Sequence, residues 1–318
     1  MKFSLYLPTG LGHDFAGHTD PVAAYETITE LARAADESGY ETVWVADHFV
    51  PFPPAPDYVF ESWTTLTALA RDTGRIRIGQ MVTGNNYRNP ALQAKMASTL
   101  DVISHGRLTF GIGAGWYEDE YTAYGYRFDD APTRLRQLGE AARIIRSMWT
   151  QPETTFDGKH YRVHRALNDP KGVQQPHIPL LIAGAGEKVT LRLVAEHADA
   201  CNVQVSPDEL VRKYRILAEH CAALGRDYDT ITRTSTSYCI IADTDAEARA
   251  QVPPWSPMVF PGELADYGLI GTLDTIRDRI AAYQAAGVDE LLIGFHNSLD
   301  PGTVRDFAKE FIDADELP

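Results

Sequence analysis

Short apolar runs with β character alternate with longer segments of helical periodicity along nearly all 318 residues of the chain. This alternation predicts βα units and a parallel sheet. Helix starts are marked as well, because Asp20 and Asn89 each stand directly before a proline, the pairing of an N-cap residue with proline at the first helical position. Eight segments have strand character, namely residues 2–8, 42–46, 76–83, 108–113, 179–183, 199–205, 232–241 and 290–295.

Eight strands with helical crossovers predict an α/β fold, a (β/α)8 TIM barrel that occupies residues 1–318 as a single domain. The rhythm breaks near residues 150–178 and 250–270, which predicts insertions after strands 4 and 7. Within the first insertion, Asp157-Gly158 between two β-like runs predicts a hairpin turn. A doubly wound open sheet is the alternative, but no GxGxxG follows the first strand, as a dinucleotide-binding sheet would require.

Composition narrows the classes of partner. Lysine and arginine number 29 against 44 acidic residues, so the net charge of −15 argues against a general binder of nucleic acid or membrane surfaces. The N-terminal MKFSLYLPTG lacks the apolar region of a signal peptide, and no run approaches the ~20 apolar residues of a membrane span. We therefore expect a cytoplasmic protein that acts on a small molecule.

Three widely spaced cysteines, Cys201, Cys221 and Cys239, suggest neither a disulfide framework nor a zinc motif. They are expected to be reduced and structural. No metal site is predicted.

Active sites in such barrels lie at the carboxyl ends of the strands, which singles out a few segments. Asp47-His48 follows the second strand, where His48 can give or take a proton near neutral pH and Asp47 can tune its charge. The simpler interpretation is a histidine that only ends a strand. Gly113-Ala114-Gly115 follows the fourth strand and lets backbone approach a flat ring or a phosphate, although a tight turn would look the same.

After the fifth strand, Gly184-Ala185-Gly186-Glu187 leads into a helix whose N-terminus would favour an anion. A phosphate there would be repelled if the Glu187 carboxylate faced it. Residues 150–178 and 250–265 are expected to cover the site. Four aromatic residues would make its pocket apolar, or would instead pack the insertions onto the barrel: Trp63, Trp116, Trp255 and Phe260.

Longer runs carry a family resemblance. Residues 79–97 (GQMVTGNNYRNPALQAKMA), 100–108 (LDVISHGRL) and 111–117 (GIGAGWY) together resemble the bacterial luciferase-like superfamily. With residues 120–125 (EYTAYG) and 170–179 (PKGVQQPHIP), they are similar to its F420-dependent oxidoreductase branch. Residues 186–191 (GEKVTL) and Ala198-Asp199 fit the same pattern, so the resemblance spans nearly the whole chain.

The resemblance implies a dimeric TIM barrel that binds F420 or a flavin at the strand ends, with a non-prolyl cis peptide at Met81–Val82. It implies His48 as the catalytic acid/base. Relatives that oxidise sugar phosphates carry a catalytic glutamate where Trp116 stands here, which argues against that chemistry. The implied cofactor-binding residues are Asp47, Met81, Val82, Gly84, Ala114, Gly115, Trp116, Asp119, Gly184, Gly186, Glu187, Val189 and Thr190. The last four, Gly186, Glu187, Val189 and Thr190, would contact the phosphate.

Three functions remain open at this point. The leading hypothesis is hydride transfer between F420 and a small organic substrate, in which the protein supplies geometry and electrostatics. The second is an FMN-dependent monooxygenase fed by a separate flavin reductase. The third is a flavin-binding barrel that has lost catalysis, against which the Asp47-His48 pair and the glycine turns argue.

Overall fold

The computed structural model describes residues 1–312 and contains a closed barrel of parallel strands. Going round the barrel, the order is β1, β2, β3, β5, β8, β9, β10 and β12; β9 pairs with both β8 and β10, and β12 returns to β1. The closure confirms the predicted TIM barrel and rejects the open sheet. The strands are β1 Lys2–Tyr6, β2 Thr42–Val45, β3 Arg77–Gln80, β5 Leu108–Gly113, β8 Leu180–Ala183, β9 Ala200–Asn202, β10 Thr232–Ile241 and β12 Glu290–Phe295.

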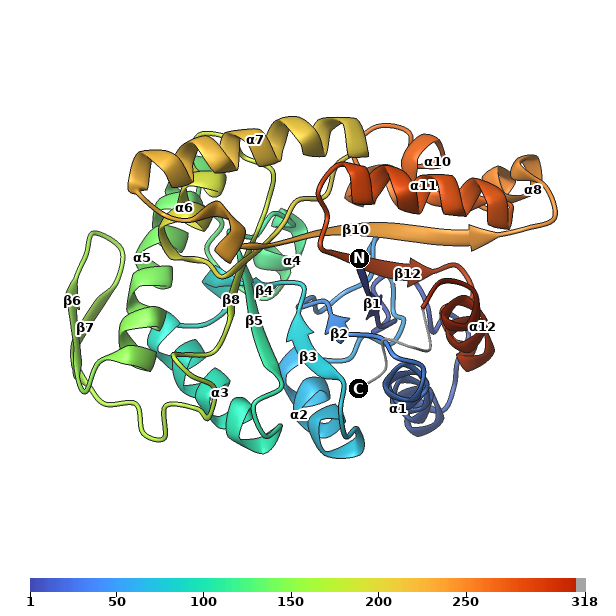
Figure 1. Ribbon diagram of the computed structural model, residues 1–318. Helices are drawn as coiled ribbons and strands as arrows, with labels where there is room; N and C mark the ends of the chain where they lie inside the picture. The colour runs from blue at the N-terminus through green and yellow to red at the C-terminus, as the bar shows by residue number, and fades with distance from the viewer. Residues whose placement is uncertain (313–318) are drawn as a thin grey trace.

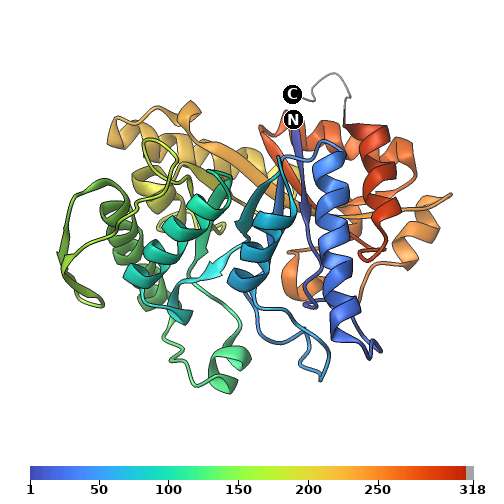
Figure 2. The same cartoon turned by 90° about the horizontal axis from the view of Figure 1, so that it is seen from below.

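Helices surround the barrel (Figure 1), and Figure 2 shows the first three of them side by side along the N-terminal strands. Asp20 and Asn89 cap α1 and α3 as predicted, since Asp20 accepts two backbone N–H groups of the first turn and Asn89 accepts one. The helices are α1 Pro21–Glu37, α2 Ser62–Asp72, α3 Pro90–Ile103, α4 Glu118–Ala123, α5 Ala131–Thr150, α6 Thr190–His197, α7 Pro207–Leu224, α8 Asp245–Ala250, α9 Ser256–Val259, α10 Leu264–Tyr267, α11 Leu273–Ala285 and α12 Pro301–Phe311, with 3-10 turns η1 Asn85–Tyr87 and η2 Tyr228–Thr230.

Two hydrophobic layers hold the fold together. The larger layer fills the space between strands and helices. A smaller cluster, built on Trp44, Leu181, Ala200 and Leu292, fills the barrel interior below the strand ends. These side chains fill the barrel interior and form the floor beneath the carboxyl ends of the strands. None of the helices within residues 1–312 combines the length and apolar character needed to cross a bilayer.

The third barrel strand is interrupted, which differs from the single strand predicted over 76–83. β3 ends at Gln80, and β4 Thr83–Gly84 then pairs with β5. The peptide bond between Met81 and Val82 is cis, as the family resemblance implied. Residues 81–82 thus form a bulge at the carboxyl end of the strand, with both side chains against the interior cluster.

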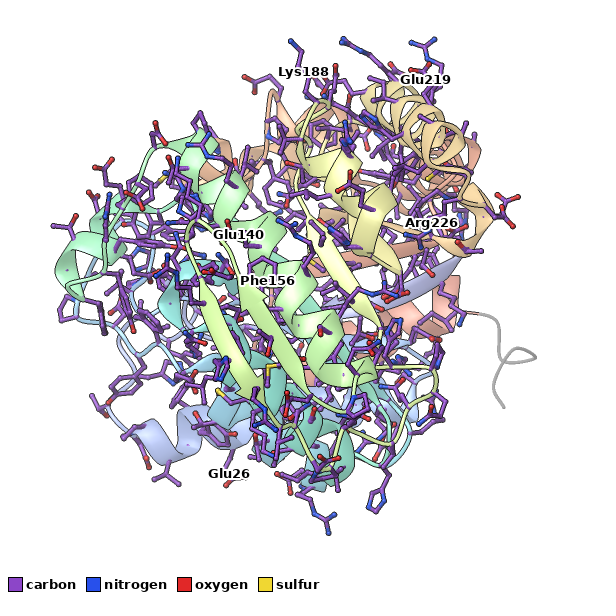
Figure 3. All side chains as sticks on the ribbon, turned by 90° about the vertical axis from the view of Figure 1, so that its left-hand side faces the viewer. Glu26, Glu140, Phe156, Lys188, Glu219 and Arg226 are labelled. Carbon is purple, nitrogen blue, oxygen red and sulfur yellow. The ribbon has the colours of Figure 1, made fainter. Side chains whose placement is uncertain are left out.

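The insertion at residues 150–178 contains the predicted hairpin, β6 Thr154–Asp157 with β7 Arg162–Ala166. Its loop has four residues rather than the two of a tight Asp-Gly turn, because the Glu140 carboxylate accepts the N–H groups of Lys159, His160 and Tyr161 and opens it. Figure 3 shows the hairpin lying along α5, with Phe156 beside Glu140. The hairpin therefore does not cover the strand ends, and that expectation was wrong.

The insertion after strand 7 does reach the strand ends. Residues 243–268 carry three short helices, α8, α9 and α10, and β11 Leu269–Gly271 then extends the sheet by pairing with β10 outside the barrel. The three cysteines are free and buried, as expected.

Candidate active site

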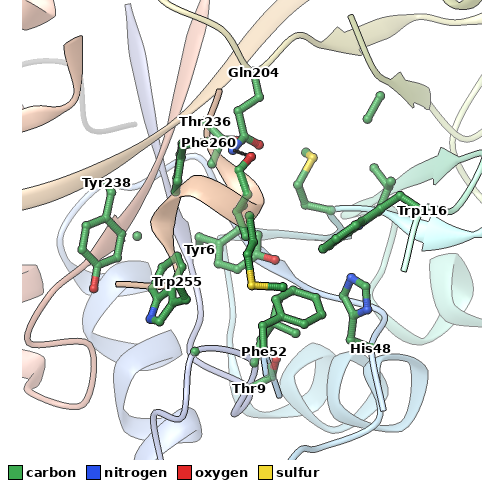
Figure 4. A pocket seen from close by; sticks show the side chains of 18 of the residues that line it. Tyr6, Thr9, His48, Phe52, Trp116, Gln204, Thr236, Tyr238, Trp255 and Phe260 are labelled. Atoms are coloured by element: carbon green, nitrogen blue, oxygen red, sulfur yellow. Dashed lines mark hydrogen bonds between the residues drawn. The ribbon is translucent and has the colours of Figure 1, made fainter. Parts of the chain in front are cut away.

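A cavity of about 970 Å³ opens at the carboxyl ends of the strands, where the barrel rule placed the site. Figure 4 shows His48, Phe52 and Trp116 on one side and Tyr238 and Trp255 across from them. Ten of the fourteen predicted site residues line this cavity: Asp47, His48, Met81, Val82, Gly84, Ala114, Gly115, Trp116, Gly184 and Thr190.

The other four predicted residues lie outside the cavity lining. Asp119 is exposed on α4. Gly186, Glu187 and Val189 form the turn that leads into α6. The Glu187 carboxylate pairs with Lys213 at 2.8 Å and Arg212 at 3.0 Å, so the repulsion of a phosphate considered above does not arise.

His48 is held by a buried carboxylate. Its Nδ1 lies 2.9 Å from Oε2 of Glu120, a fully buried residue of α4. Phe52 and Trp116 meet the imidazole edge to face, with ring centroids 4.9 and 5.9 Å away. A carboxylate only accepts hydrogen bonds, so Nδ1 carries the proton and Nε2 becomes the nitrogen available for proton transfer.

Glu120 has four donors. Oε1 accepts the N–H groups of Phe49 at 2.5 Å and Val50 at 3.2 Å, and Oε2 accepts the Tyr87 hydroxyl as well as His48. Burial alone would raise the pKa of Glu120, but these hydrogen bonds, that of His48 foremost, bring it below its ordinary value. The carboxylate is therefore ionised at neutral pH and keeps the imidazole in one orientation.

Asp47 organises the neighbouring loop. Its buried carboxylate accepts from Thr83 Oγ1 at 2.6 Å, from the Gly84 N–H at 3.1 Å and from both Arg88 nitrogens at 2.6 and 3.0 Å. Arg88 also reaches Glu61 at 2.8 Å. Asp47 thus links the end of β2 to β4 and holds the bulge in place. Its negative charge is balanced by Arg88, so it is not available to pair with a ligand cation.

The bulge and the fourth-strand glycines fit each other. An added Cβ at Gly113 would lie 2.8 Å from Val82 Cγ2, and one at Gly111 would lie 3.0 Å from Val82 Cγ1. Glycine at both positions therefore makes room for Val82. The wall formed by Met81, Val82 and Ala114 consists of backbone and small or apolar side chains, so a flat ring can lie against it.

Gly115 has a left-handed backbone, with φ +77°, and a Cβ there would fall 2.0 Å from the buried Tyr121 hydroxyl oxygen. We expect Gly115→Ala to lower the free energy of unfolding by roughly 2–5 kcal/mol, since the backbone penalty adds to the displacement of Tyr121. Gly17→Ala is a matched control, because Gly17 has φ +79° and no atom of the described residues lies within 4 Å of its Cβ position.

Chemical denaturation of both variants checks this expectation. The control should lose only the backbone part, roughly 1–2 kcal/mol. Equal losses of unfolding free energy in the two variants would show that Tyr121 moves aside at no cost and does not constrain the turn at Gly115.

The start of α6 carries unpaired N–H groups near the cavity, which Thr190 lines. Within residues 1–312, the N–H groups of Lys188, Val189 and Thr190 have no hydrogen-bond acceptor, and no side chain caps this helix. A Cβ at Gly186 would lie 2.8 Å from Thr190 Oγ1, so glycine lets the turn close onto that hydroxyl. Free N–H groups at a helix N-terminus can bind an anion, so the anion site expected from the sequence stays a prediction.

The apolar wall comes from the second insertion. Residues 250–260 line the cavity through Trp255 and Phe260, as predicted, and Trp255 meets Tyr238 edge to face at 5.5 Å. Trp63 was predicted to line the pocket and does not. It lies on α2 and is buried, with its ring near that of Phe110 on β5.

Sequence reasoning did not single out Glu120, Arg88 or Tyr87 as site residues. Each completes a contact across a long separation, 72 residues for His48 and Glu120 and 41 for Asp47 and Arg88. The only available signal was position, because Glu120 and Arg88 fall inside the runs that carry the family resemblance.

Comparisons with known proteins identify the family of the chain. The chain is 28% identical to an F420-dependent glucose-6-phosphate dehydrogenase of Nocardia farcinica, over 90% of this chain and 84% of that protein. It is 27% identical to an FMNH2-dependent dimethylsulfone monooxygenase of Pseudomonas putida, over 93% and 90%. The solved structure of an F420-dependent secondary alcohol dehydrogenase with an F420–acetone adduct matches the fold with a TM-score of 0.84, 18% identity and 98% coverage of both chains. A family model described as luciferase-like monooxygenase matches residues 1–267. The chain therefore belongs to the luciferase-like monooxygenase family.

Proposed function

We propose that this protein is an F420-dependent oxidoreductase that transfers a hydride between F420 and a small organic substrate. The observation that carries the proposal is the His48–Glu120 pair, which fixes an acid/base nitrogen in the cavity next to the bulge at Met81–Val82. The F420-dependent relative from Nocardia farcinica supports the choice of cofactor.

The residues present fit such a cofactor. Met81, Val82 and Ala114 offer a flat apolar wall for its ring system, and the free N–H groups before α6 suit its phosphate. When bound, F420 accepts or donates a hydride at a ring carbon.

His48 is then the proton-handling group. In the oxidative direction its Nε2 takes the proton from the substrate hydroxyl or amine as the adjacent carbon loses hydride, and in the reductive direction it returns that proton. Glu120 stabilises the imidazolium that forms. Phe52, Trp255 and Phe260 exclude water from this step.

An FMN-dependent monooxygenase that receives reduced FMN from a reductase is the second candidate. The Pseudomonas putida relative favours it, because that protein is FMNH2-dependent and the match covers nearly the whole of both chains. We further propose a homodimer in either case, on family resemblance.

Equilibrium titration of F420 and FMN into cofactor-free protein, followed by fluorescence, separates the two candidates. We expect F420 to bind with a dissociation constant of about 1 μM or lower, and FMN to bind much more weakly. A preference for FMN would instead favour the oxygenase. Tight binding of either cofactor without turnover on a broad substrate panel would point to a non-catalytic barrel.

A further inference from the structure

A second polar corner faces the cavity, built on the turn from Gly10 to Asp14 that follows β1. His13 and Asp14 both line the cavity. The Gly12 Cβ position lies 3.3 Å from the Trp255 ring, so the turn borders the aromatic wall that faces His48 in Figure 4. We call His13 and Asp14, with their partners Asp57 and Ser298, the turn subsite.

Among the side chains that line the cavity, carboxylates are present and lysine and arginine are absent within residues 1–312. The carboxylates are those of Asp14 and Asp47. Asp47 is balanced by Arg88, as described above. Asp14 accepts the Gly10 N–H at 3.0 Å and the Ser298 hydroxyl at 3.1 Å, and it forms no ion pair within the described chain. The cavity therefore contains one carboxylate without a cation.

Burial raises the pKa of Asp14, and the hydrogen bonds from Ser298, Gly10 and Gly12 offset part of that rise. A bound ammonium group would remove the remaining penalty, because an opposite charge favours the ionised carboxyl. A bound phosphate or carboxylate would increase it.

His13 adds a second recognition group. Its Nδ1 lies 2.6 Å from Asp57 Oδ2, which leaves Nε2 without a protein partner in residues 1–312. Two backbone hydrogen bonds, from the His13 N–H to Gly10 at 3.2 Å and from the Ala16 N–H to His13 at 3.0 Å, hold the turn in place. Nε2 can accept a hydrogen bond from a hydroxyl or amine when the ring is neutral.

We propose that the turn subsite binds the polar end of the substrate and that this end is an ammonium or hydroxyl group. The inference rests on the proposed function, since it assigns the substrate class of the same cavity. Trp255, Tyr238 and Phe260 provide an apolar path beside the subsite. The substrate class is therefore a neutral or cationic organic molecule with an apolar body, whose reacting hydroxyl or amine meets His48 and whose second hydroxyl or amino group meets the turn subsite.

A charge series on one aromatic frame tests this assignment. We would titrate 2-phenylethylamine, 2-phenylethanol, 3-phenylpropionate and phenyl phosphate into the full-length protein at pH 7 and follow tryptophan fluorescence. The amine should bind most tightly and the alcohol next, and both anions should bind at least roughly tenfold more weakly than the amine. The ammonium donates a charge-assisted hydrogen bond to Asp14, whereas the anions are repelled by it.

Asp14→Asn should weaken binding of the amine by roughly tenfold and change binding of the alcohol by less than about threefold. Asp243→Asn removes the same charge from an exposed residue outside the cavity and should leave the series unchanged. Phenyl phosphate binding as tightly as the amine, or an amine affinity untouched by Asp14→Asn, would overturn the proposal.

The two proposals fail separately. The charge series on wild type and on Asp14→Asn needs no F420, so it tests the turn subsite whether or not F420 binds. Weak F420 binding by wild-type protein would count against the proposed function alone. F420 binding that is retained by Asp14→Asn would show that the variant is folded.

Discussion

Replacing His48 with alanine is expected to cut turnover by roughly 10²–10⁴, the usual contribution of a positioned acid/base. The loss should fall on kcat, and the affinity for F420 should stay within about threefold of wild type. The imidazole contacts Phe52 and Trp116 through its edges, and within residues 1–312 its one hydrogen bond goes to Glu120, so the cavity walls remain in the variant.

Stopped-flow monitoring of F420 reduction or oxidation, with the best substrate from a panel of alcohols, imines and alkenes, would measure the effect. His164→Ala is the matched control, since His164 is exposed on β7 and lies outside the cavity. Unchanged turnover in the His48 variant would eliminate the acid/base role.

Glu120→Gln should cut turnover by roughly 10²–10⁴, nearly as much as His48→Ala. The substitution only replaces one carboxylate oxygen with an amide nitrogen. The amide orientation in this variant is fixed. The Phe49 and Val50 N–H groups can only donate, so they retain the carbonyl oxygen and turn the amide NH2 toward His48. Nδ1 must then accept a hydrogen bond, and the proton moves to Nε2, which can no longer act as base.

The matched control is Glu140→Gln. Glu140 also accepts three backbone N–H groups while buried, but it contacts the hairpin loop rather than a histidine. Both variants should lose stability, and only Glu120→Gln should lose turnover and shift the pH profile of kcat/KM. Parallel losses of turnover in the two variants would reduce Glu120 to a structural residue.

Glu120 also makes the stability of the protein depend on pH. Burial raises the pKa of Glu120, and hydrogen bonds from His48, Phe49 and Tyr87 lower it by more, so the folded value lies below the ordinary 4.5. A lowered pKa contributes stability above the unfolded value, and that contribution disappears as the pH falls through the folded value. The advantage of wild type over Glu120→Gln in denaturation midpoint should therefore shrink below about pH 4.5.

The long elements were predictable because each carries its own local signal. The N-caps at Asp20 and Asn89 and the apolar runs of the barrel strands depend on neighbours in sequence. β11 and the short helices α8 to α10 were not predicted. Three residues of β11 become a strand only because β10 extends beyond the barrel and offers Cys239 to Ile241 as partners.

The site residues likewise fall into those that were predictable from the sequence and those that were not. His48 and the glycine turns were predictable because the carboxyl ends of barrel strands converge whatever the sequence between them. Glu120 and Arg88 were not, because side chains 72 and 41 residues from their partners meet only after the barrel has closed. The hairpin of residues 150–178 was misplaced for a related reason, since Glu140 on α5 determines where its loop lies.

The cavity is assembled from two sets of segments that come from different parts of the chain. The ends of β2 to β5 carry His48, the bulge and the glycine turn, whereas the turn after β1 and residues 250–260 after β10 carry the opposite wall. The two walls can consequently be altered independently of each other. Substitutions within residues 250–260 can reshape the apolar wall while His48 keeps its contact with Glu120, so a change of substrate need not disturb the acid/base pair.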